Sequence, residues 1–128
     1  CALPILANPN IVNVTSFYGN TSYLIPSGTS ATAWTALTPA SGTVNKIDNL
    51  VVSNVTSSAA SVTVSVNSAT GGGGTAYRIA YQISVPANAS LIVIDKTTAI
   101  YLGESQSIVV TSGTSSALEC TASYEAIT

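Results

Sequence analysis

Strict alternation of apolar and polar residues in the middle of the chain is the feature that most constrains the fold. In residues 61–66 every second position is a valine, and in residues 77–85 every second position is a tyrosine, an isoleucine or a valine. A side-chain period of two puts each apolar set on one face of a β-strand. Because serine-rich and glycine-rich turns link these runs, residues 43–85 predict a strand meander with one face toward the core and one toward water.

The run at residues 44–55 has apolar residues on both faces of its predicted strand. Ile47 and Val51 lie on one face, and Leu50 and Val52 lie on the other. We interpret this pattern in two ways. Either the strand lies in mid-sheet and is covered on both sides, or a β-bulge near residue 49 switches its faces.

Short apolar runs between turn-forming residues continue along the rest of the chain. The further strand candidates are residues 11–15, 21–25, 32–37, 90–95, 99–102, 106–111 and 117–125. We expect a turn at residues 18–20 and a hairpin made by the last two candidates. Roughly nine or ten short strands without a helical period predict an all-β fold, a jelly-roll-like antiparallel β-sandwich. The sandwich would occupy residues 11–128 as a single domain.

Residues 1–10 contain Pro4 and Pro9 and show no periodicity, so they predict an extended N-terminal arm. The arm carries three large apolar side chains. They would either fold back on their own domain or reach a neighbouring subunit. Together with three aromatic residues of the domain they are the candidate subunit contacts. These candidates are Leu3, Ile5, Leu6, Trp34, Tyr77 and Tyr81.

The chain has few charged residues, which limits the classes of partner that it can bind. Charged residues make up 6% of the chain, against roughly 25% in ordinary soluble proteins. Little repulsion then separates neighbouring molecules, and we expect packing against other protein surfaces. The basic residues Lys46, Arg78 and Lys96 are too few to track phosphates, so we expect no nucleic-acid partner. Apolar runs fall short of about 18 residues, so we expect no membrane span.

The residues that most enzymes and metal sites use are missing. The chain has no histidine, which removes Ser–His triads and the commonest metal ligand. We expect the carboxylates Asp95, Glu104, Glu119 and Glu125 at the surface rather than facing one another across a cleft. A calcium site on Asp95 or Glu104 stays as an alternative. The tetraglycine at residues 71–74 predicts a hairpin tip rather than a phosphate loop, since no lysine follows it. We therefore expect no catalytic residue, no cofactor and no metal.

The two cysteines are not spaced for zinc. Cys120 alternates in phase with Leu118 and Ala122, which predicts a buried thiol. A Cys1–Cys120 disulfide stays open, because sequence separation does not fix the distance in space.

Five segments in the last two thirds of the chain resemble segments of a known group of proteins. They are residues 46–54, 74–80, 85–91, 100–105 and 123–127. In order and spacing they resemble a small β-sandwich pattern of tailed-bacteriophage virion proteins, especially those of cyanophage-like viruses. The resemblance implies an accessory structural part of a virion, such as a head decoration, a neck or tail attachment, or a fibre-associated domain. Its partners would be other copies of itself and other virion proteins. Glu104 is followed by serine where the pattern has Gly and Asp, so no ion-binding role is implied for this turn.

We therefore expect a non-enzymatic virion protein that assembles with its neighbours. The alternative is a carbohydrate-binding or adhesin-type surface domain for host-surface glycans, in which several of the six tyrosines form a sugar platform. A third hypothesis is a secreted, pilus-like surface subunit, which an upstream signal peptide would favour.

Overall fold

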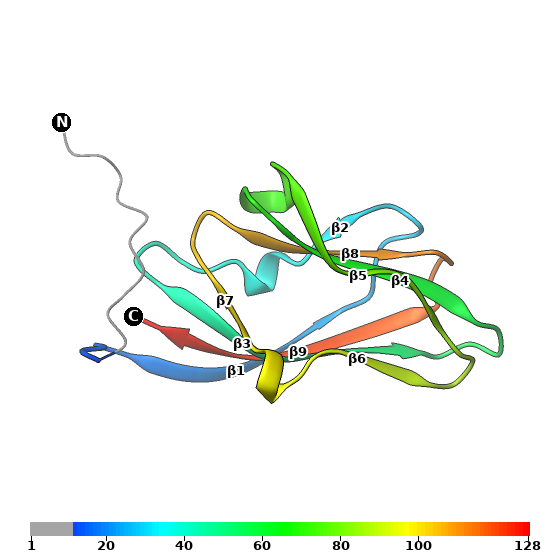
Figure 1. The fold of residues 1–128 in the computed structure, drawn as a ribbon, viewed down its shortest axis with the longest axis horizontal. Helices are drawn as coiled ribbons and strands as arrows, with labels where there is room; N and C mark the ends of the chain where they lie inside the picture. Colours follow the sequence, from blue (N-terminus) through cyan, green and yellow to red (C-terminus); the bar gives the residue numbers. More distant parts are fainter. Residues whose placement is uncertain (1–11) are drawn as a thin grey trace.

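The computed structural model describes residues 12–128, which form two antiparallel β-sheets packed face to face (Figure 1). This confirms the prediction of an all-β antiparallel sandwich. The predicted arm, residues 1–10, lies outside the described residues. The strands of this part of the chain are β1 (Phe17–Leu24), β2 (Thr32–Ala33), β3 (Val44–Asn54), β4 (Ala60–Asn67), β5 (Ala76–Val85), β6 (Ser90–Ile94), β7 (Ile100–Leu102), β8 (Ser107–Ser112) and β9 (Leu118–Ile127).

Successive strands are divided between the two sheets. In sheet A the order is β1-β9-β3-β6, and β7 also pairs with β3; in sheet B the order is β2-β8-β4-β5. In Figure 1 sheet B forms the upper layer and sheet A the lower one. The predicted meander is confirmed for β4 and β5, which pair antiparallel on either side of the tetraglycine loop, and is wrong for β3, which belongs to sheet A whereas β4 and β5 belong to sheet B. The predicted hairpin of β8 and β9 is wrong for the same reason.

The crossing from β3 to β4 is organised by the buried side chain of Asn54. Its amide group donates hydrogen bonds to the carbonyl oxygens of Ser58, at 2.8 Å, and of Val85 in β5, at 3.0 Å. Its Oδ1 accepts hydrogen bonds from the backbone N–H and the hydroxyl of Thr56, at 2.9 and 2.8 Å. One side chain thus satisfies backbone groups of Thr56 and Ser58 in the crossing and of Val85 in β5.

The core lies between the sheets and is almost wholly aliphatic. Its largest fully buried side chains are Trp34, Leu37, Val44, Ile47, Leu50, Val52, Val62, Val64, Ile94, Leu102, Ile108 and Leu118. Cys120 is a free thiol, 2% exposed, so the prediction of a buried thiol is confirmed. Cys1, the other half of the disulfide considered above, lies outside the described residues.

A β-bulge in β3 explains why this strand has apolar residues at both phases. The register of β3 against β9 shifts between Ile47 and Asn49. Ile47 and Leu50 are three residues apart, yet both are fully buried. Asn49 secures the bulge, since its Oδ1 accepts a hydrogen bond from the backbone N–H of Ser123 at 3.1 Å. The bulge alternative is confirmed, whereas cover on both sides is wrong, because Val51 lines a groove on the outer face.

Strand β5 departs most from its sequence pattern. Four of its five alternating apolar residues are exposed: Tyr77 by 64%, Ile79 by 40%, Tyr81 by 58% and Ile83 by 41%. β5 is an edge strand, and its register against β4 shifts twice within a few residues. At one shift Gln82 takes a φ of 49°. The prediction that this apolar set faces the core is therefore wrong for these four residues, because bulges and an open edge break the simple alternation, and it is confirmed for Val85, which is fully buried.

The N-terminal part of the described chain also differs from expectation. Residues 12–15 contain no strand, and the predicted turn at 18–20 lies inside β1, which pairs with β9 along its length. The predicted strand at residues 32–37 is shortened to β2 and followed by a 3₁₀-helix, η1 (Thr35–Leu37). Trp34 lies between them in the core.

Candidate functional site

A groove lies on the outer face of sheet A, with a volume of about 490 Å³. Strands β3, β6 and β9 and the 3₁₀-helix η3 (Lys96–Thr98) contribute its walls and floor. Its lining residues are Lys46, Asp48, Asn49, Val51, Ile92, Asp95, Lys96 and Glu125. Its volume is in the usual range for small-molecule binding sites, roughly 300–1,000 Å³.

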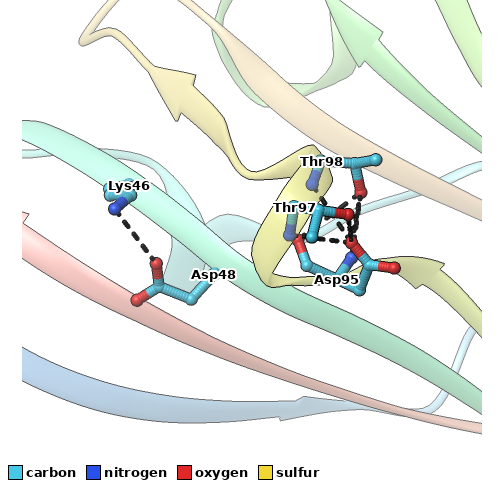
Figure 2. A network of polar contacts seen from close by, with 5 residues as sticks. All are labelled: Lys46, Asp48, Asp95, Thr97 and Thr98. Atoms are coloured by element: carbon cyan, nitrogen blue, oxygen red, sulfur yellow. Dashed lines mark hydrogen bonds and ion pairs between the residues drawn. The ribbon is translucent and has the colours of Figure 1, made fainter.

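The groove gathers most of the charge that this chain possesses. Five of the eight charged residues of the sequence line it, three of them carboxylates and two of them lysines. The Lys46 ammonium lies 3.7 Å from the carboxylate of Asp48 in the same strand (Figure 2). Glu125 of β9 stands directly opposite Lys46 in the register. Within residues 12–128 Glu125 makes no ion pair, so its carboxylate is available to a partner.

The carboxylate of Asp95 is occupied by its own turn. Its Oδ1 accepts hydrogen bonds from the hydroxyl and backbone N–H of Thr97, at 2.6 and 2.9 Å, and from the backbone N–H of Thr98, at 3.1 Å (Figure 2). The hydrogen bonds from Thr97 hold the pKa of Asp95 below its usual value. This capping box fixes η3 at the side of the groove.

The two carboxylates of the calcium alternative, Asp95 and Glu104, both accept hydrogen bonds from backbone N–H groups. The carboxylate of Glu104 accepts a hydrogen bond from the backbone N–H of Gly42 at 2.6 Å. Among the described residues, no group of three or more Cys, Asp or Glu side chains is placed to hold a metal ion.

The floor of the groove is apolar. Val51 of β3 and Ile92 of β6 are cross-strand partners, and Ile92 is 64% exposed. An exposed isoleucine beside an open groove is a place where a partner side chain gains by excluding water. The groove therefore combines an apolar floor with a charged rim.

A second surface lies on sheet B, at its β5 edge. Tyr77, Ile79, Tyr81 and Ile83 are exposed there, and we call these four residues the β5 patch. The Arg78 guanidinium lies 5.2 Å from the centre of the Tyr81 ring, in cation–π contact. Arg78 is the one charged residue in the four strands of sheet B. This edge is thus large, aromatic and nearly uncharged.

The predicted contact residues differ in how exposed they are. Tyr77 and Tyr81 are both exposed on β5. Trp34 is 1% exposed, and its indole Nε1 donates a hydrogen bond to Ser22 Oγ at 2.9 Å, so it is not available for the subunit contact that the sequence suggested. Leu3, Ile5 and Leu6 lie outside the described residues.

The exposed tyrosines of β1 and those of β5 do not form one sugar platform. Tyr18 and Tyr23 lie on β1, at one edge of sheet A. Tyr77 and Tyr81 lie on β5 of sheet B, which contacts β6 at the other edge of sheet A.

Sequence reasoning missed the groove, because it treated each charged residue singly as a solvated side chain. Asp48 lies in the bulge of β3, while Asp95 and Lys96 lie in a turn much later in the chain. Only the pairing of β3 with β6 and β9 brings them together. The sequence signal that could have pointed to the groove is that the chain has so few charged residues.

Neither the scan against protein-family models nor the search of curated proteins finds a match to this chain. Within residues 12–128 no helix is long and apolar enough to cross a membrane.

Proposed function

We propose that this protein is a non-enzymatic structural subunit of a tailed-phage virion, which assembles by packing against other copies of itself or other virion proteins. The β5 patch carries the assembly part of this proposal. The five segments that resemble phage β-sandwich proteins support the virion as its location. Head decoration, neck or tail attachment and fibre association all fit the proposal.

The β5 patch supports assembly on energetic grounds. Fully burying an isoleucine-sized side chain contributes roughly 1.5–3 kcal/mol, and the patch offers four large side chains that are 40–64% exposed. Sheet B carries little charge, so a protein that binds to it has few charged groups to desolvate. The two register shifts of β5 disturb its free edge, which disfavours addition of a further strand. Contact through side chains is therefore the mode that this edge favours.

Substitution of the patch tests the proposal. In the variant Tyr77→Ser/Tyr81→Ser, we expect self-association measured by sedimentation velocity over a range of concentrations to weaken by at least about tenfold, which corresponds to about 1.4 kcal/mol. The matched control is Tyr18→Ser/Tyr23→Ser, which removes two equally exposed tyrosines from β1 and should leave association unchanged.

The virion assignment is tested separately, by mass spectrometry of purified particles from the source virus. We expect the chain in fixed proportion to the major capsid protein. A protein that is monomeric at all concentrations and absent from particles would contradict the proposal.

The groove favours the second candidate function, a carbohydrate-binding or adhesin-type domain for host-surface glycans. It places the ammonium of Lys46 and the carboxylate of Glu125 around the apolar floor formed by Val51 and Ile92. Polar groups around an apolar surface suit the two kinds of face that a sugar ring presents. Binding on a glycan array that is lost in Ile92→Asp would support this function, and no binding at high protein concentration would count against it.

A further inference from the structure

The β5 patch and the groove have complementary chemistry. The patch consists of exposed apolar side chains along an edge strand, and the cation Arg78 lies against one of them, Tyr81. The groove is a hollow with an apolar floor and three carboxylates against two lysines. Of the three basic residues in the sequence, Lys46 and Lys96 line the groove, and Arg78 alone lies elsewhere.

The groove has one carboxylate to offer a cation from outside. Asp48 is paired with Lys46, and Asp95 is engaged by Thr97 and Thr98. Glu125 makes no ion pair within the described residues. Its charge is therefore the natural acceptor for an incoming guanidinium, which carboxylates bind in a bidentate manner.

We propose that the β5 patch of one copy docks in the groove of a second copy, with Arg78 facing Glu125 and the patch side chains covering Val51 and Ile92. The proposal rests on the assembly function above and names its partner and its contact. Because sheet B carries little charge, little charge has to be desolvated when it meets a second copy. The opposite charges of Arg78 and Glu125 make the contact specific.

The contact joins two different surfaces, so copies make it either reciprocally across a two-fold axis, which closes a dimer, or head-to-tail. In the head-to-tail case each copy that uses its patch keeps its groove free for the next copy. Such heterologous contacts build closed rings when the rotation closes and filaments when it does not. Two β5 patches facing each other across a two-fold axis would instead bring Arg78 close to its own copy, which like charge disfavours.

Charge reversal tests the contact. We expect Arg78→Glu and Glu125→Arg each to weaken self-association by about tenfold or more in sedimentation velocity. The double variant Arg78→Glu/Glu125→Arg should recover most of the association, because it restores an opposite pair between neighbouring copies. Glu119→Arg is the matched control, since Glu119 lies on the same strand as Glu125 but outside the groove.

A second pair of variants tests the apolar part. Tyr81→Asp spoils the patch and leaves the groove intact, whereas Ile92→Asp does the reverse; both side chains are exposed, so folding should be kept. Mixed in equal amounts, they retain one complete contact between them. We expect the mixture to form one-to-one dimers and nothing larger.

The outcomes separate this proposal from the assembly function. If the β5 variants weaken association while Glu125→Arg and Ile92→Asp do not, assembly through β5 stands and docking in the groove is overturned. If neither the β5 nor the groove variants change the association of the wild-type protein, both are overturned. Recovery in the charge-reversed double variant supports the contact of Arg78 with Glu125, and no recovery overturns it.

Discussion

At the scale of single residues, a few buried polar side chains stabilise the sandwich through their hydrogen bonds. Asn54 is 2% exposed and satisfies groups at both ends of the β3–β4 crossing. Ser22 receives the indole N–H of Trp34, so the largest side chain of the core is buried without an unpaired donor. In residues 12–128 every buried side-chain nitrogen and oxygen has a partner. Removing the partner of any of these groups therefore lowers the stability of the fold.

Asn54→Ala should destabilise the fold by at least about 2 kcal/mol. The substitution leaves the carbonyls of Ser58 and Val85 without their donor, and each buried group left unpaired costs roughly 1–3 kcal/mol. Urea unfolding followed by circular dichroism measures the change. Asn20→Ala, at an exposed position of β1, is the control and should change stability by less than about 0.5 kcal/mol. Equal losses in both variants would contradict the role given to Asn54.

Cys120 should make stability fall at alkaline pH. Burial raises the pKa of its thiol from 9.0 to about 12, so folding favours the protonated form. This contribution is complete below pH 9.0 and is lost as the pH rises through about 12. The loss is at most about 1.4 kcal/mol per pH unit.

The measurement compares Cys1→Ser with Cys1→Ser/Cys120→Ala between about pH 8 and 11, a range that spans the onset of thiol ionisation in the unfolded chain. The two proteins differ only at residue 120, so the difference in their free energies of unfolding isolates Cys120. The difference should be flat below about pH 9 and then change in favour of the alanine variant. A difference that stays flat throughout would contradict a buried, protonated thiol.

At the scale of elements, bulges decide what each strand presents. In β3 one bulge keeps Ile47 and Leu50 in the core and turns Asp48 toward the groove. In β5 the shifts leave Ala80 and Val85 buried and expose the tyrosines and isoleucines of the patch. Both proposed contact surfaces therefore adjoin bulges, which re-aim side chains without changing the strand order.

The bulge at Gln82 should tolerate glycine but not a β-branched residue. Its φ of 49° lies in the left-handed region, where branched side chains are strained. We expect Gln82→Val to destabilise the protein by roughly 1–2 kcal/mol, and Gln82→Gly to be neutral or slightly stabilising. Ser84→Val in the same strand, at an ordinary φ, should cost less than about 0.5 kcal/mol. Thermal unfolding compares the three, and an equal effect of the two valines would contradict strain at residue 82.

At the scale of the whole molecule, the sandwich separates two surfaces of different chemistry. Sheet A gathers charge around an apolar groove, while sheet B offers an aromatic edge with Arg78 as its one charged strand residue. The proposed contact joins the β5 patch of one copy to the groove of another. The charge-reversal and patch variants above test this design directly.

Local pattern in the sequence determined that the chain is a β-sandwich and where most strands lie. The alternation in β4, the bulge near Asn49 and the burial of Cys120 could all be predicted, because each depends on the period of side chains along one strand. The absence of histidine likewise limits the chemistry through composition alone, since no arrangement of the strands can supply an imidazole that the chain lacks.

Only the tertiary structure decided which strands are neighbours and which apolar residues stay exposed. Alternation fixes two faces for a strand but does not say which sheet it joins, so β3 and β4 could not be separated from their sequences. The exposure of Tyr77 and Tyr81 follows from the edge position and shifted register of β5, and the groove follows from the pairing of β3 with β6 and β9. These are long-range pairings, and nothing within a single strand encodes them.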